Sequence, residues 1–162
     1  FLLTHDLDAL TVHGLTAKEL YKKPSDWDEI TKAVAVRNSM QSRTMLIGNG
    51  NVTSYSKALE RHRQSGADGV MIGRGILQDI NCFDPEGKTL SHKQLRALLV
   101  KHLELFEATH GATSSGFVTM KKYFRLYIRD FDGSALLREK LMSAKTVSEA
   151  LKLSGMDENH EM

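Results

Sequence analysis

Two short apolar runs that each end in a pair of glycines constrain this sequence most strongly. The first covers residues 44–50 and the second residues 69–75. A continuous apolar run of this length is typical of a strand buried on both faces. Glycine allows the backbone to turn tightly or to approach a ligand closely. Because parallel strands end at the same edge of a sheet, the two turns predict a phosphate site at that edge, where Arg74 adds a fixed positive charge.

The first 80 residues alternate between strand and helix patterns. We expect strands at 9–14, 44–48 and 69–73, a helix capped by Ser25 that runs to about Ser39, and a helix that begins after Thr53 or Ser54. This βαβαβ order predicts parallel strands with right-handed crossovers. Three strands cannot close a barrel, so we expect the chain to be the carboxyl part of a longer (β/α)8 TIM-barrel protein. The alternative is a small open sheet with an exposed edge.

The pattern changes at about residue 81. Residues 81–90 are rich in turn-forming residues and predict a linker. Residues 91–157 then predict a small helical bundle, with helices near 91–110, 115–129, 134–143 and 146–155. Ser91 and Gln94 form a capping box at the start of the first of these helices. The predicted fold class is therefore α/β followed by an all-α domain.

Composition narrows the class of protein without naming a function. No apolar run is long enough to span a membrane. The single cysteine, Cys82, excludes an internal disulfide and fits a reducing cytoplasm, and no zinc-ligand spacing is present. The net charge is only +2, but residues 116–145 hold seven basic and three acidic side chains. This local surplus favours a polyanionic partner for the second half.

Four motifs carry a resemblance to a known family. They are Leu10-Thr11-Val12-His13-Gly14, Ser25-Asp26-Trp27, Ile47-Gly48-Asn49-Gly50 and the segment 65–75. In order and spacing they resemble the carboxyl half of a tRNA-dihydrouridine synthase. The resemblance implies an FMN-dependent oxidoreductase that NADPH reduces and that passes hydride to carbon 6 of a uridine in tRNA. It also implies a protein that is a monomer at full length.

The sequence departs from the family pattern in three places. The family's catalytic cysteine lies in an upstream motif that Cys82 does not match, so we predict no catalytic residue in this segment and no activity for it alone. Leu15 stands where the family usually has arginine, and Asn51 where it usually has an acidic residue. Either exchange would alter how the adjacent loop is anchored.

The candidate cofactor site combines the strand-end residues. By resemblance His13 contacts the flavin, and the alternative is a histidine packed at the barrel rim. Backbone amides around the two glycine turns fit a cradle for the FMN phosphate or ribityl chain, and the alternative is a pair of ordinary left-handed turns with Arg74 in a surface ion pair. The candidate cofactor-binding residues are His13, Asn49, Gly50, Asn51, Gly73 and Arg74.

A basic stripe is the candidate RNA contact. Lys121, Arg125 and Arg129 recur every four residues, so on one continuous helix they would share a face. Lys122 lies beside them and Arg138 follows on the next predicted helix. The functional hypothesis is a surface that tracks tRNA phosphates, and the alternative is a solvated helix face.

Three functions remain open on the sequence alone. The leading hypothesis is a segment of a flavin-dependent tRNA uridine reductase. The first alternative is another FMN barrel oxidoreductase that acts on a small ring substrate, which the basic helical domain argues against. The second alternative is a non-catalytic RNA-binding fragment. Fold analogy does not choose among them, because barrels host many chemistries.

Overall fold

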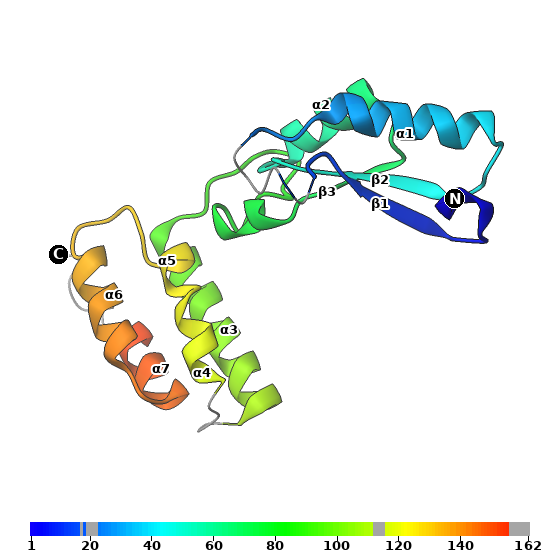
Figure 1. Cartoon of the computed structure of the whole chain (residues 1–162). Coiled ribbons are helices and arrows are strands. Elements are labelled where there is room, and N and C mark those ends of the chain that lie inside the picture. Colours follow the sequence, from blue (N-terminus) through cyan, green and yellow to red (C-terminus); the bar gives the residue numbers. More distant parts are fainter. Residues whose placement is uncertain (17, 19–22, 112–115, 156–162) are drawn as a thin grey trace. The chain divides into compact units, whose positions relative to one another are not determined.

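The computed structural model describes residues 1–16, 18, 23–111 and 116–155 (Figure 1). The chain divides into two compact units, Phe1–Lys88 and Thr89–Met162, and each is described here by itself. The boundary lies inside the segment 81–90 that the sequence marks as a linker. The predicted end of the helical domain at residue 157 falls outside the described residues.

The first unit is built on a three-stranded parallel sheet. Its strands are β1 (Ala9–His13), β2 (Met45–Asn49) and β3 (Gly69–Met71), in the order β1-β2-β3. A short 3-10 helix, η1 (Leu2–Thr4), precedes β1. The helices α1 (Trp27–Ser39) and α2 (Tyr55–Ser65) lie on the same side of this sheet (Figure 1). Both strand pairs are parallel, so the predicted βαβαβ order with parallel strands is confirmed for these three strands.

Only one face of the sheet is covered within this unit. Leu46 is buried beneath the helices with Ile30 and Trp27 of α1. On the opposite face, Met45 is 51% and Met71 is 42% exposed. The prediction of strands buried on both faces therefore does not hold for the unit by itself, because its helices form a single layer.

Local capping chemistry sets the helix starts. Asp26, and not the predicted Ser25, is the N-cap of α1, and its carboxylate accepts a hydrogen bond from the backbone N–H of Asp28. Aspartate is as good a cap as serine, and this leaves the Ser25 hydroxyl to bond elsewhere. Ser54 caps α2, as one of the two predicted residues, and Gly66 ends it at a φ of 69°.

The third strand is shorter than the predicted 69–73. It ends at Met71, and the chain turns into a 3-10 helix, η2 (Arg74–Leu77), after Gly73. Gly75 is buried in that helix, and a Cβ there would lie 2.6 Å from the carbonyl oxygen of Val52. Glycine at this position lets the two loops pack against each other.

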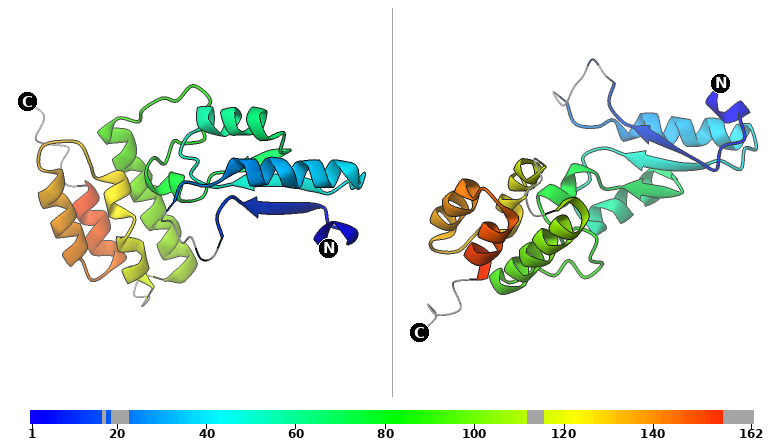
Figure 2. Two further views of the ribbon diagram at one scale, coloured as in Figure 1. Left: turned by 45° about the horizontal axis from the view of Figure 1, so that its top comes forward. Right: turned by 90° about the horizontal axis from the view of Figure 1, so that it is seen from below.

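The second unit is a bundle of five helices within its described part. They are α3 (His92–His110), α4 (Phe117–Lys121), α5 (Phe124–Tyr127), α6 (Ser134–Ser143) and α7 (Val147–Gly155). The two views of Figure 2 show α6 and α7 side by side, and α3 packs against both α7 and α5. The predicted capping box of Ser91 and Gln94 is confirmed at the start of α3.

The buried face of α3 is formed by residues four apart. Leu95, Leu99 and Leu103 are buried, whereas Leu105 is 57% exposed. Steps of four residues from Leu95 lead to Leu103, so Leu105 falls on another face of the helix.

The predicted single helix over 115–129 is two short helices in the structure, and residue 115 lies outside the described part. Lys122 and Tyr123 separate α4 from α5, and helical geometry ends at Ile128, with φ −108° and ψ 89°. The side chain of Ile128 is fully buried and its carbonyl oxygen accepts a hydrogen bond from Arg138 of α6. Tertiary packing overrides the local helical preference here.

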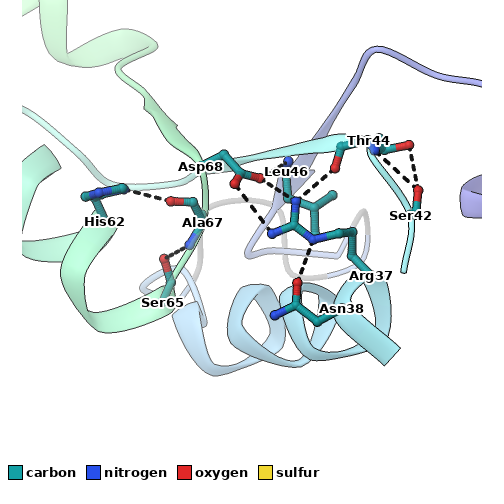
Figure 3. A network of polar contacts seen from close by, with 9 residues as sticks. All are labelled: Arg37, Asn38, Ser42, Thr44, Leu46, His62, Ser65, Ala67 and Asp68. Atoms are coloured by element: carbon teal, nitrogen blue, oxygen red, sulfur yellow. Dashed lines mark hydrogen bonds and ion pairs between the residues drawn. The ribbon is translucent and has the colours of Figure 1, made fainter. Parts of the chain in front are cut away.

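A polar network fixes the edge of the sheet at which β2 and β3 begin (Figure 3). The Asp68 carboxylate accepts hydrogen bonds from the backbone N–H of Leu46 (2.7 Å) and from the guanidinium of Arg37 (2.8 Å). Arg37 also donates to the carbonyl oxygen of Thr44 at 3.0 Å. The backbone N–H of Leu46 and then the Arg37 side chain hold the pKa of Asp68 below its ordinary value.

No helix in the described parts of the chain combines the length and the apolar character that crossing a membrane requires.

We predict that Asp68→Asn lowers the free energy of unfolding at pH 7 by about 1–2 kcal/mol, near the low end for charged hydrogen bonds because the side chain is 35% exposed. Because folding lowers the pKa of Asp68, its contribution is present above the unfolded-state pKa and is lost as pH falls below about 4. Urea denaturation at pH 7 and pH 3 measures both effects. A matched change of the exposed Asp6 to Asn controls for lost charge, and equal effects of the two variants at pH 7 would contradict the role of Asp68.

Candidate functional site: a strand-end cavity and an arginine-lined hollow

The six residues predicted to bind a cofactor line one cavity in the first unit. Its volume is about 400 Å³, and it lies where the strands end. His13 and Asn49 are the last residues of β1 and β2 and pair with each other in register. The lining consists of His13, Asn49, Gly50, Asn51, Val52, Thr53, Gly73, Arg74, Gly75 and Gln78. The expectation that two glycine turns share one edge of the sheet is therefore met by the geometry.

The turn after β2 requires the residues found there. Gly50 has a φ of 142°, and a Cβ at this position would overlap with the side chain of Ser25. Asn51 has a φ of 53°, in the left-handed region that asparagine tolerates better than most residues. This backbone makes a tight reversal directly beneath the cavity.

The carbonyl groups of this turn accept hydrogen bonds from the end of β1 and from the start of α1. The carbonyl oxygen of Asn49 accepts hydrogen bonds from the Gly14 backbone N–H (3.0 Å) and from His13 Nδ1 (3.1 Å). Since a carbonyl oxygen only accepts, Nδ1 carries the proton of the His13 ring, which leaves Nε2 of the neutral ring as an acceptor. The carbonyl oxygen of Gly50 accepts from the buried Trp27 indole N–H at 3.0 Å.

The amide groups of the same turn have a different environment. The backbone N–H of Gly50 points along the sheet toward β3, where Met71 is the register partner of Asn49. Among the described residues, no protein oxygen accepts a hydrogen bond from the backbone N–H of Asn51. An amide of this kind, in a cavity that Arg74 also lines, suits an anion. The residues present therefore fit a phosphate monoester such as that of FMN.

Cys82 lies in the core and not on the cavity wall. It is buried in the cluster that contains Trp27 and Ile30, and burial raises the pKa of its thiol. Because the thiolate is the reactive form, this cysteine is a poor nucleophile. Its side chain is packed in the core, and it is not among the residues that line the cavity.

Three of the five basic residues predicted to contact RNA meet at a second cavity, in the helical unit. Arg125, Arg129 and Arg138 line a hollow of about 450 Å³ together with Asp130, Phe131, Asp132 and Ser134. The break after α5 makes this possible, because Arg129 lies beyond the helix end and not on the predicted continuous face. The sequence predicted one helix face, whereas in the structure the three arginines come from α5, from the loop after it and from α6.

The two lysines are engaged elsewhere. Lys121 Nζ donates to the carbonyl oxygen of Met142 at 2.6 Å and lies over the Phe117 ring. Lys122 Nζ lies 4.9 Å from the centroid of the Tyr123 ring. The structure therefore does not gather all five cations into one surface.

Carboxylates offset part of the charge of the arginine cluster. Asp130 and Asp132 share the hollow, and Arg129 Nε lies 3.6 Å from Asp130 Oδ2. Arg138 is also partly committed, since Nη1 donates to the carbonyl oxygen of Ile128 at 2.7 Å. The positive potential in the hollow is therefore weaker than the surplus of basic over acidic residues in 116–145 suggests.

Sequence reasoning missed two contributors to the strand-end cavity. Ser25 donates from Oγ to Asn51 Oδ1 at 2.6 Å, and Trp27 donates to Gly50, although the sequence assigned them to helix capping and packing. These pairs are 26 and 23 residues apart. The only available signal was the quoted Ser25-Asp26-Trp27 motif, which carries no information about its partner.

Comparison with known proteins places the chain in a family. A family model described as dihydrouridine synthase matches residues 5–160, so the chain belongs to the dihydrouridine synthase family. A protein of Staphylococcus epidermidis named "Probable tRNA-dihydrouridine synthase" is 33% identical over 148 residues, which cover 91% of this chain and 45% of that protein. A Bacillus subtilis protein named "Probable tRNA-dihydrouridine synthase 2" is 31% identical over 152 residues, which cover 94% of this chain and 47% of that protein. The chain spans about half the length of these curated relatives, and the match falls on their carboxyl half.

We predict that Gly50→Ala lowers the free energy of unfolding by about 2 kcal/mol or more, because its φ of 142° is strained for any side chain and Ser25 fills the required space. Gly73→Ala is the matched control in the same cavity, since no atom lies within 4 Å of a Cβ there. Urea denaturation of both variants measures the difference. Equal losses would show that the fit around Gly50 is not the constraint described.

Proposed function

We propose that the protein to which this chain belongs is an FMN-dependent tRNA-dihydrouridine synthase. In this proposal it reduces the C5=C6 bond of a uridine in tRNA, with NADPH as the source of reducing equivalents. This chain supplies the carboxyl part of an FMN-binding TIM barrel together with a helical domain that contacts tRNA. The observation that carries the proposal is the single strand-end cavity, lined by all six candidate residues, in a member of the dihydrouridine synthase family.

In this proposal, different residues of the cavity bind different parts of FMN. We assign the phosphate to the amide of Asn51 and to the Arg74 guanidinium, whose charge suits a dianionic group. Asn49 and Gly73 line the cavity beside them, and His13 faces the flavin end with an acceptor nitrogen. When bound and reduced, FMN supplies the hydride for the uridine ring.

No catalytic residue is assigned to this segment. The Cys82 thiol is buried in the core, so the proton for carbon 5 must come from a group outside these residues. On this account the segment alone is inactive. A tRNA substrate places the proposed reaction in the cytoplasm, and we expect the full-length protein to act as a monomer.

The helical unit supplies the contact with RNA in this proposal. Arg125 and Arg129 are the strongest candidates, because both line the hollow. Lys121 donates a hydrogen bond to the carbonyl oxygen of Met142, and Arg138 donates one to that of Ile128. Both side chains therefore also stabilise the fold of the helical unit. Lys122 completes the set that the sequence predicted.

We predict that Arg74→Ala in the full-length protein weakens FMN binding by about 1.5–3 kcal/mol, the scale of a charge-assisted hydrogen bond. Titration of the apoprotein, followed by quenching of flavin fluorescence, measures the change. Arg63→Ala, which removes an exposed arginine of α2 outside the cavity, is the control. Unchanged FMN affinity for Arg74→Ala would remove this residue from the phosphate site.

We predict that Arg125→Glu combined with Arg129→Glu weakens tRNA binding at least about tenfold. The slope of log K against log salt should fall by about 1.4–1.8, because two phosphate contacts are lost. Lys140→Glu combined with Lys152→Glu changes the net charge equally at exposed sites outside the hollow. Filter binding across a salt series compares the tRNA affinities of the two double variants. Equal losses of affinity would show that only the overall charge matters and that the arginine cluster is not a specific contact.

A further inference from the structure

Three side chains, at the end of β1, just before α1 and at the start of α1, hold the turn after β2 by hydrogen bonds. His13 bonds to the carbonyl oxygen of Asn49, Trp27 to the carbonyl oxygen of Gly50, and Ser25 to the side-chain oxygen of Asn51. Each of the three consecutive turn residues therefore accepts one of these hydrogen bonds. The donors therefore come from the end of β1, which is the neighbour of β2 in the sheet, and from the start of α1.

These ties determine where the amides of the turn point. In a planar trans peptide the N–H and the C=O point in opposite directions. Holding the Asn49 carbonyl toward β1 therefore directs the N–H of Gly50 toward β3, where Met71 is in register with Asn49. Holding the Gly50 carbonyl toward the buried Trp27 directs the N–H of Asn51 away from the core. Among the described residues, the Asn51 amide has no protein acceptor.

The segment that carries the ties is itself anchored. The backbone N–H of Asp26 donates to the carbonyl oxygen of Gly14 at 2.6 Å, and Gly14 in turn donates to Asn49. Asp26 provides the cap of α1, so the Ser25 hydroxyl is not needed for the helix. Its hydrogen bond to Asn51 serves the turn alone.

We propose that Ser25 and Trp27 are positioning residues, which hold the Asn51 amide in the orientation that binds a phosphate. This inference rests on the proposed function, since the phosphate is that of FMN. Neither residue needs to touch the ligand. Ser25 acts through Asn51, whose left-handed backbone at a φ of 53° is stabilised when its side-chain oxygen is held.

The test compares FMN with riboflavin, which has the same ring and ribityl chain but no phosphate. Fluorescence titration of the full-length apoprotein gives both dissociation constants for each variant. Ser25→Ala and Trp27→Phe should each weaken FMN binding about three- to tenfold, the effect of losing one ordinary hydrogen bond. Riboflavin binding should change less than about twofold. A role in folding alone would weaken both ligands equally.

A double-mutant cycle tests whether Ser25 acts through Asn51. Asn51→Gly removes the acceptor oxygen but keeps a residue that adopts positive φ without strain. Ser25→Ala combined with Asn51→Gly should bind FMN no more weakly than the weaker single variant. Ser39→Ala, which removes a hydroxyl bonded within α1 far along the chain from the turn, is the matched control and should leave the FMN to riboflavin ratio unchanged.

Two outcomes overturn the inference and are distinguishable. If Arg74→Ala weakens FMN selectively while Ser25→Ala and Trp27→Phe do not, the positioning role is wrong and the proposed function stands. If the unmodified protein binds FMN and riboflavin equally and Arg74→Ala has no effect, the phosphate site is absent and both proposals fail. A selective loss of FMN affinity in both positioning variants, with coupling between Ser25 and Asn51, supports the inference.

Discussion

The in-register parallel pairing of β2 with its two neighbours is the constraint on which the rest of the first unit depends. It places Asn49 beside His13 on one side and beside Met71 on the other, so all three strands end at one edge. The turns that follow must then share the space above that edge. At the opposite edge, Asp68 and Arg37 hold the starts of β2 and β3, which keeps this register fixed.

The strand-end cavity is therefore built from backbone as much as from side chains. Its glycines let the chain reverse where a Cβ would collide with Ser25 or with the Val52 carbonyl. Its amides are directed by hydrogen bonds made on the far side of their own peptide planes. Arg74 adds charge to this frame. Such a site suits the phosphate of a flavin, whereas a site built only from long side chains would have to be ordered on binding.

The sequence predicted the backbone pattern of this site but not the interactions that hold it. Buried apolar runs, their alternation with helices and the paired glycines are local signals, and they placed all six candidate residues in one cavity. The Ser25–Asn51 and Trp27–Gly50 hydrogen bonds join residues more than 20 positions apart, which periodicity does not report. In the helical unit, local periodicity predicted a continuous basic stripe, and packing of Ile128 broke the helix and regrouped the arginines.

The central claim is that the strand-end cavity holds the FMN phosphate, and a crystal structure of the full-length protein with FMN bound measures this directly. We predict phosphate oxygens within about 3 Å of the amide nitrogen of Asn51 and of the Arg74 guanidinium, the usual length of a charge-assisted hydrogen bond. A phosphate bound away from these two groups, with the 49–51 turn unchanged, would contradict this claim.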